Sequence, residues 1–234
     1  MNLDRIIKRL ERKTWTRIVA FGSSNTERFI HGTHWFDWFE LGVKHTHGRI
    51  AHFINAGLSG DTSRGLLERL ETQAAIYSPD VVVVTIGGND SGVDTGIDES
   101  EFRSNLTALE ERIRSSGATL VFQTYYSQDL SQDQPERATR FLQYMQIVRE
   151  VAPTTGSGLI DHLTRWEPLR LCHPQEYRTL MRDANHVNTL GNMVLGLDLN
   201  RAFGLHLDAA TLAHCGEGLR IQKILDELST QTTS

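Results

Sequence analysis

Residues 80–90, DVVVVTIGGND, give the clearest indication of the architecture. The segment 80–87 is almost continuously apolar and rich in β-branched residues, which is typical of a strand covered on both faces. The run ends in GGND, residues 87–90, a polar break with two glycines. A strand of this kind predicts a parallel sheet with helices packed on both sides.

Four further segments have the character of buried strands. They are residues 17–22, 50–55, 118–124 and 157–161. Segments with helical periodicity alternate with them, and strand-helix-strand units at this spacing imply right-handed crossovers between parallel strands. The sequence therefore predicts the α/β class, as a three-layer α/β/α sandwich with a five-stranded parallel sheet.

Apolar residues at intervals of three and four mark the helical segments. The expected helices lie near the N-terminus with Leu3, Ile6, Ile7 and Leu10 on one face, between residues 62 and 79, and over 98–117, 135–153, 188–203 and 217–229. The expected N-caps are Asp61 or Thr62, Asp98 and Asn188. In the helix that Pro135 opens, we expect Pro153 to end the helix and Leu142 to face inward.

The composition is that of one globular domain spanning residues 1–234. The net charge is -5 and the basic residues are spread along the chain, which argues against a nucleic-acid partner. Residues 1–15 are charged throughout, so we expect neither a signal peptide nor a membrane contact. Cys172 and Cys215 stand in unrelated segments, as reduced thiols do, which favours a cytoplasmic location.

Polar breaks follow the first three predicted strands. They are GSSN at 22–25, NAGLSGDT at 55–62 and GGND at 87–90. Ligands of parallel α/β sheets bind beyond the carboxyl ends of the strands. We therefore expect the three breaks to converge on one edge of the sheet and to form the site there.

A possible acid and base lie far downstream, in RDANHVNTLG, residues 182–191. Asp183 and His186 are three residues apart, and on a tight loop the carboxylate can accept the Nδ1 proton of the imidazole while Nε2 points elsewhere. Oxyanion donors are available in a backbone N–H beside the nucleophile, the Gly57 N–H and the Asn89 amide. With a serine from the first break, these groups supply what a serine esterase needs.

Four stretches, in order along the chain, resemble the four sequence blocks of the SGNH hydrolase superfamily, the GDSL-type esterases and lipases. They are FGSSNT, NAGLSGDT, GGND and DANH. The resemblance implies a five-stranded flavodoxin-like sheet and a Ser-His-Asp triad. It implies Ser24 as nucleophile, His186 as general base and Asp183 as the acid that orients it, with Ser24, Gly57 and Asn89 as oxyanion donors.

One position departs from the family pattern. Members usually have Gly-Asp-Ser in the first block, whereas this chain has Gly22-Ser23-Ser24. The missing aspartate is not part of the triad, so its loss is expected to alter local hydrogen bonding more than the chemistry.

The expected activity is hydrolysis of short acyl esters, acetyl above all, on carbohydrates or other small molecules. A thioesterase or lysophospholipase with the same triad, and a non-catalytic ester- or sugar-binding domain, are the alternatives. We expect no cofactor, since Gly-x-x-x-x-Gly-Lys and Gly-x-Gly-x-x-Gly loops are both absent from the sequence. The sequence leaves the oligomeric state open.

Other residues have competing interpretations. The histidines at 31, 34, 45, 47 and 52 suggest a metal, but no cysteine or closely spaced acid accompanies them, and no metal is expected. Trp35, Phe36 and Trp38 could line a pocket, although packing of a helix is favoured. Asp161-His162 is a rival acid and base, but adjacent residues in extended chain point to opposite faces. Tyr125 and Tyr126 are expected to border the site.

Overall fold

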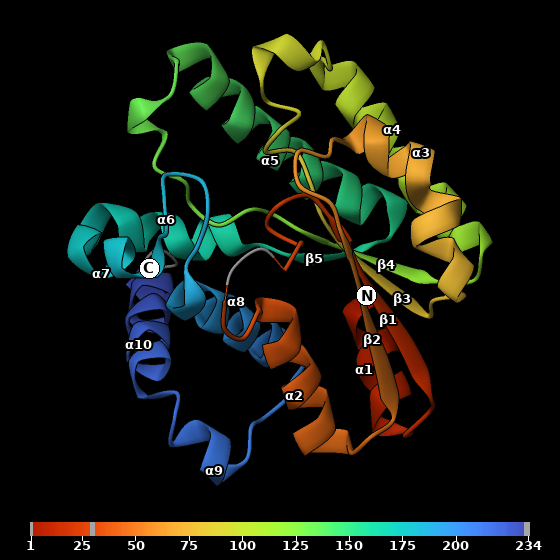
Figure 1. The fold of residues 1–234 in the computed structure, drawn as a ribbon, viewed down its shortest axis with the longest axis vertical. Helices are drawn as coiled ribbons and strands as arrows, with labels where there is room; N and C mark the ends of the chain where they lie inside the picture. Colours follow the sequence, from red (N-terminus) through yellow and green to blue (C-terminus); the bar gives the residue numbers. More distant parts are fainter. Residues whose placement is uncertain (1, 29–30, 232–234) are drawn as a thin grey trace.

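The computed structural model describes residues 2–28 and 31–231. Its centre is a five-stranded, wholly parallel sheet in the order β2-β1-β3-β4-β5 (Figure 1). The strands are β1 (Thr16–Gly22), β2 (Ala51–Gly57), β3 (Val81–Thr85), β4 (Thr119–Gln123) and β5 (Gly158–Ile160). The predicted fold class and all five strands are confirmed.

Helices cover both faces of the sheet (Figure 1). The described α-helices are α1 (Asn2–Glu11), α2 (Trp35–His47), α3 (Ser63–Gln73), α4 (Glu99–Ser115), α5 (Pro135–Thr155), α6 (His162–Cys172), α7 (Pro174–Leu180), α8 (Thr189–Ala202), α9 (Ala209–Leu212) and α10 (Gly216–Gln231). Successive side chains of a strand point to opposite faces. Ile18 of β1 thus joins the core beneath α1, α2 and α8, and Val19 joins the core beneath α3, α4 and α5.

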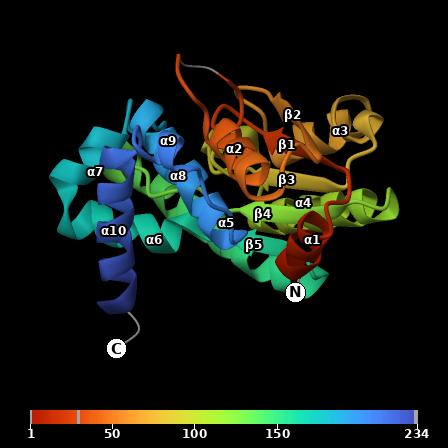
Figure 2. The same ribbon diagram turned by 90° about the horizontal axis from the view of Figure 1, so that it is seen from below.

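Helix α10 packs beside the sheet, against α6 and α8 (Figure 2). Its Ile221 and Leu225 are buried in the same core as Ile18. None of the described helices combines the length and the apolar character that crossing a bilayer requires. Cys172 and Cys215 are both free thiols.

The predicted helix caps are largely those observed. Thr62, and not Asp61, caps α3 by accepting the Gly65 N–H at 3.3 Å. Asp98 caps α4, and Asn188 caps α8 by accepting two backbone N–H groups. The cap of α8 matters most here, because the predicted acid and base lie just before it.

Two predictions about α5 are wrong. The helix passes through Pro153 to Thr155 and ends at Gly156, which has φ +76°. A proline so near the end removes only one late helical hydrogen bond, and the glycine provides the left-handed conformation that stops the helix. Leu142 is 49% exposed, because only the side of α5 that carries Phe141 and Met145 faces the sheet.

Three helices, α6, α7 and the four-residue α9, were not expected from periodicity. Helix α6 contains Pro168, and α7 is short and begins at a proline, so neither has a sustained amphipathic pattern. The aromatic segment after β1 is the helix α2 that was favoured for it. Phe36 and Phe39 are fully buried and pack against Phe53.

Candidate active site

The three polar breaks meet at one edge of the sheet. Gly22, the last residue of β1, is in register with Gly57 of β2 on one side and Thr85 of β3 on the other. The segments that follow these strands therefore leave the sheet next to one another, as the sequence predicted.

Ser24, His186 and Asp183 form a hydrogen-bonded chain at this edge. Ser24 Oγ lies 2.9 Å from His186 Nε2, although the two residues are 162 positions apart. His186 Nδ1 lies 2.9 Å from Asp183 Oδ1 and 3.1 Å from Oδ2. This is the geometry in which a carboxylate holds the imidazole tautomer and the imidazole can take the hydroxyl proton.

A tight loop brings Asp183 and His186 together. The Arg182 N–H donates to the His186 carbonyl at 2.8 Å, and Met181 and Val187 form an isolated antiparallel bridge. Asp183 Oδ1 also accepts the N–H of Asn185 at 2.9 Å and of His186 at 2.8 Å. The carboxylate that orients the imidazole thus also holds the loop.

The charge on Asp183 is stabilised by its surroundings. Partial burial raises the pKa of this carboxyl, but hydrogen bonds from the Asn185 N–H and from His186 outweigh the burial. The net pKa is below the ordinary value, so Asp183 is ionised at neutral pH.

The two adjacent serines of the first break have different environments. Ser23 is 1% exposed, and its Oγ lies 2.8 Å from the Tyr125 hydroxyl. Ser24 is only partly buried and faces His186. Gly22 is required just before them, because a Cβ there would lie 2.5 Å from the Thr85 carbonyl oxygen. Of the two hydroxyls, only that of Ser24 lies beside an imidazole and belongs to a partly exposed residue.

The predicted oxyanion donors differ in whether their N–H hydrogens already have a hydrogen-bond partner. Among the described residues the Ser24 N–H has no hydrogen-bond partner. The Asn89 amide donates one hydrogen to the Asp61 carbonyl at 2.7 Å, which leaves its second hydrogen for a ligand. The Gly57 N–H, however, already donates to Asn55 Oδ1 at 3.0 Å.

A second glycine lies three residues further along the same loop. Gly60 is exposed, has φ +79°, and its N–H has no partner within the described part of the chain. It directly precedes Asp61, whose carbonyl holds the Asn89 amide. Gly57 was predicted as a donor because the absence of a side chain permits close approach and because the resemblance implies the glycine of the second block.

A small open hollow adjoins Ser24 and His186. The other residues that line it are Asn25, Glu27, His34, Arg182, Val187 and Asn192. Most of these side chains are polar, and sequence reasoning missed Glu27, Arg182 and Asn192, because no pattern links residues so far apart. Glu27 braces the neighbouring loop by accepting the Ser59 N–H at 2.7 Å.

The histidine-rich segment has structural roles in the described residues. His34 caps α2, where its Nδ1 accepts the Phe36 N–H at 3.3 Å. Burial lowers the pKa of His34 to about 4, so its ring is neutral. His45 Nδ1 accepts the Asp208 N–H at 3.1 Å. Within the described ranges, no three His, Cys, Asp or Glu side chains are grouped as a metal site would need.

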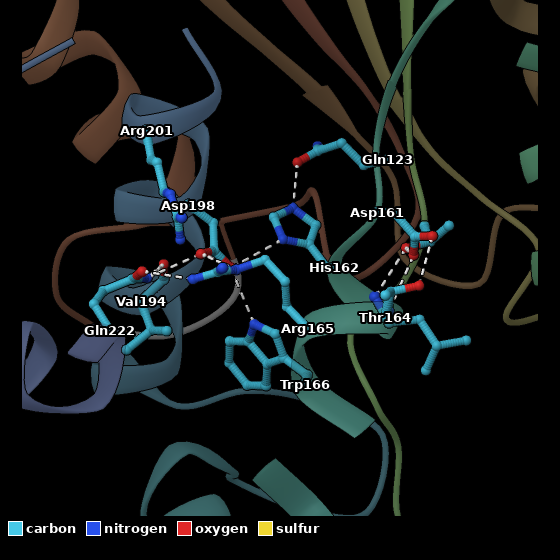
Figure 3. A network of polar contacts seen from close by, with 12 residues as sticks. Gln123, Asp161, His162, Thr164, Arg165, Trp166, Val194, Asp198, Arg201 and Gln222 are labelled. Atoms are coloured by element: carbon cyan, nitrogen blue, oxygen red, sulfur yellow. Dashed lines mark hydrogen bonds and ion pairs between the residues drawn. The ribbon is translucent and has the colours of Figure 1, made fainter. Parts of the chain in front are cut away.

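The rival pair Asp161-His162 is separated by the fold. Asp161 caps α6 and pairs with Arg149, with 2.7 Å between Oδ2 and Nε. His162 turns the other way, where its Nδ1 lies 3.3 Å from Asp198 and its Nε2 lies 2.9 Å from Gln123 Oε1 (Figure 3). The expectation that the two cannot cooperate agrees with this geometry.

Asp198 is the centre of the network around His162. It is 3% exposed and also accepts hydrogen bonds from Arg165 and Trp166 of α6 and from Gln222 of α10 (Figure 3). Burial raises the pKa of this carboxyl, but the hydrogen bond and charge of His162 outweigh it, and the net shift is downward. The network joins α6, α8 and α10 to β4 and has no nucleophile.

The chain matches the model of the GDSL-like Lipase/Acylhydrolase family over residues 20–194. The acetylxylan esterase of Geobacillus stearothermophilus is 29% identical over 176 residues, which are 70% of this chain and 74% of that protein. Esterase TesA of Pseudomonas aeruginosa is 38% identical over 68 residues, so the chain matches only 33% of its length.

Solved structures share the fold. The crystal structure of Axe2, an acetylxylan esterase from Geobacillus stearothermophilus, has a TM-score of 0.69 at 23% identity, and the match covers 84% of this chain and 98% of that one. The family model covers most of this chain, including all four sequence blocks. The chain therefore belongs to the GDSL-like lipase/acylhydrolase family of carboxylic ester hydrolases.

Proposed function

We propose that the protein hydrolyses short acyl esters, acetyl first, on carbohydrates or other small molecules, with Ser24 as nucleophile. The observation that carries the proposal is the hydrogen-bonded chain from Ser24 Oγ through His186 to Asp183. The partly exposed position of Ser24 beside a small polar hollow gives an ester access to it.

In this mechanism His186 Nε2 takes the proton of Ser24 while Oγ forms a bond to the ester carbonyl carbon. The developing oxyanion accepts the Ser24 N–H, the free Asn89 amide hydrogen and a glycine N–H of the 57–60 loop. His186 then protonates the leaving alcohol as the acyl C–O bond breaks. Water, deprotonated by His186, releases the acid and restores Ser24.

The relatives support both the residues and the acyl group. Three solved structures are of catalytic mutants of Axe2, in which a serine, an aspartate or a histidine is replaced by alanine. That aspartate and histidine are three positions apart, as Asp183 and His186 are here. Axe2 is an acetylxylan esterase, which favours an acetyl group on a sugar.

The test compares nitrophenyl acetate with nitrophenyl octanoate for the wild type and Ser24→Ala. Activity should be highest on the acetate, and Ser24→Ala should lower kcat on the order of a millionfold, because the members of a triad act as a unit. An organophosphonate should label Ser24 in the wild type, which mass spectrometry detects.

The same assay separates the alternatives. A preference for the octanoate would favour a lysophospholipase or thioesterase. Absence of both hydrolysis and labelling in the folded wild type would favour a non-catalytic binding domain. Full activity in Ser24→Ala would exclude the proposed nucleophile.

A further inference from the structure

Two consecutive tyrosines after β4 lie on either side of the nucleophile turn. The Tyr125 hydroxyl is 2.8 Å from Ser23 Oγ, and the Tyr126 hydroxyl is 2.6 Å from Asn25 Oδ1. Ser23 and Asn25 are the two chain neighbours of Ser24. Each side of the nucleophile is therefore held by one phenol.

The Tyr126 hydroxyl also contacts the loop that carries the base. It accepts the Val187 N–H at 3.0 Å and lies 2.7 Å from the Asn185 carbonyl oxygen. Asn185 and Val187 are the two chain neighbours of His186. One phenol oxygen thus contacts residues adjacent to both Ser24 and His186.

The hydroxyl of Tyr126 is held firmly in place. Tyr126 is 2% exposed, and the centroids of its ring and of the Trp166 ring are 5.3 Å apart. The segment that follows supports the same loop, because the Asp129 N–H donates to the Ala184 carbonyl at 2.9 Å. Burial raises the pKa of Tyr126 well above its usual value, so the phenol is protonated at neutral pH.

The hydrogen bond between Ser24 and His186 spans two separate segments of the chain. The two residues come from opposite ends of the chain, and the loop of His186 is closed mainly upon itself. Among the described residues, the Tyr126 hydroxyl contacts both segments at once, next to Ser24 on one side and His186 on the other.

We propose that Tyr126 is a positioning residue that couples the Ser24 turn to the His186 loop and so sets the distance between Ser24 Oγ and His186 Nε2. This inference rests on the proposed ester hydrolysis. Tyr126 itself does not touch the substrate and transfers no proton.

The test is Tyr126→Phe, which removes the hydroxyl and keeps the ring. We expect kcat on nitrophenyl acetate to fall roughly 10- to 100-fold with KM within about twofold, because a small misplacement of reacting groups costs this much. Labelling of Ser24 by an organophosphonate should slow by the same factor. All rates are compared at a temperature well below the melting temperature of the least stable variant.

Tyr144→Phe is the matched control. Tyr144 is fully buried; its hydroxyl donates to the Ile97 carbonyl at 2.5 Å and accepts a hydrogen bond from Arg140 at 3.0 Å. Among the described residues, this hydroxyl bonds to neither the Ser24 turn nor the His186 loop. The Tyr144→Phe variant loses a phenol oxygen and a hydrogen bond to a backbone carbonyl, as Tyr126→Phe does. It should therefore lower the melting temperature without changing kcat by more than about twofold.

A double-mutant cycle with His186→Ala distinguishes positioning from general support. If Tyr126 acts by aligning the base, Tyr126→Phe should change the residual rate of His186→Ala by less than about twofold. An equal fold-loss of rate from Tyr126→Phe in the wild type and in His186→Ala would overturn the inference, as would full kcat in the Tyr126→Phe single variant. In either case the activity of the wild type would still support the proposed function. An inactive, unlabelled wild type would instead overturn both.

Discussion

The Ser23 hydroxyl and the Tyr125 phenol lie 2.8 Å apart, both buried, at the position where members of this family usually carry an aspartate. Burial raises the pKa of Tyr125, so both groups are neutral at working pH. A neutral pair thus replaces a charge beside the nucleophile. The phenol that pairs with Ser23 is 102 positions away in the sequence.

Ser23→Ala should separate the roles of the two serines. The buried Tyr125 hydroxyl loses its partner, which should lower the unfolding free energy by about 1 to 2 kcal/mol in urea titrations. Because Ser24 and His186 are untouched, kcat on nitrophenyl acetate should stay within about tenfold of the wild type. A folded Ser23→Ala protein that is as inactive as Ser24→Ala would contradict this assignment.

The two glycines of the loop after β2 should respond differently to alanine. A Cβ on Gly57 would lie 2.2 Å from the Glu27 backbone nitrogen, so Gly57→Ala should cost about 2 to 3 kcal/mol of stability through overpacking. Gly60 faces open space, and Gly60→Ala should cost only about 1 kcal/mol, for the left-handed backbone. Thermal unfolding of both variants shows which substitution lowers the stability more. A larger loss for Gly60→Ala than for Gly57→Ala would contradict this packing of the loop.

Asp183→Asn should lower kcat by about 10⁴-fold, because the amide favours the wrong imidazole tautomer. The folded pKa of Asp183 is below its ordinary value of 3.8, so its ionised form stabilises the fold above that pH. This stabilisation is lost as the pH falls through the lower, folded pKa. The melting temperature of the wild type should therefore exceed that of Asp183→Asn most at neutral pH, and the gap should narrow below pH 4. A gap that is constant with pH would contradict the lowered pKa.

Asp198→Asn should destabilise the protein without a direct effect on catalysis. Removing the charge leaves Arg165 and His162 without their buried partner, which typically costs about 3 to 5 kcal/mol. Asp226→Asn is the control, because Asp226 also pairs with Arg165 but is half exposed, and it should cost less than about 1 kcal/mol. Chemical unfolding measures both, and kcat of the folded Asp198→Asn protein should remain near that of the wild type.

The sequence was sufficient for the sheet and for the convergence of Ser24, His186 and Asp183 in one hydrogen-bonded chain. The apolar run of β3 reflects burial on both faces, which is a local property of the residues. The polar breaks after β1, β2 and β3 converge because parallel strands in one sheet must end at the same edge. Asp183 and His186 could be paired because their contact lies within a single short loop.

What could not be predicted depends on contacts between distant segments. The exposure of Leu142 depends on which side of α5 meets the sheet. The contacts of Tyr126 with two separate loops follow from the tertiary fold, and no spacing in the sequence indicates them.

The loop from Met181 to Val187 has a consequence for how the site is assembled. Asp183 Oδ1 accepts hydrogen bonds from the backbone N–H groups of Asn185 and His186 and from the His186 imidazole. The acid and the base are therefore aligned by contacts within one short loop. The conformational entropy of aligning them is lost locally, when this loop closes. The remaining long-range requirement for assembling the three side chains is the distance between this loop and Ser24.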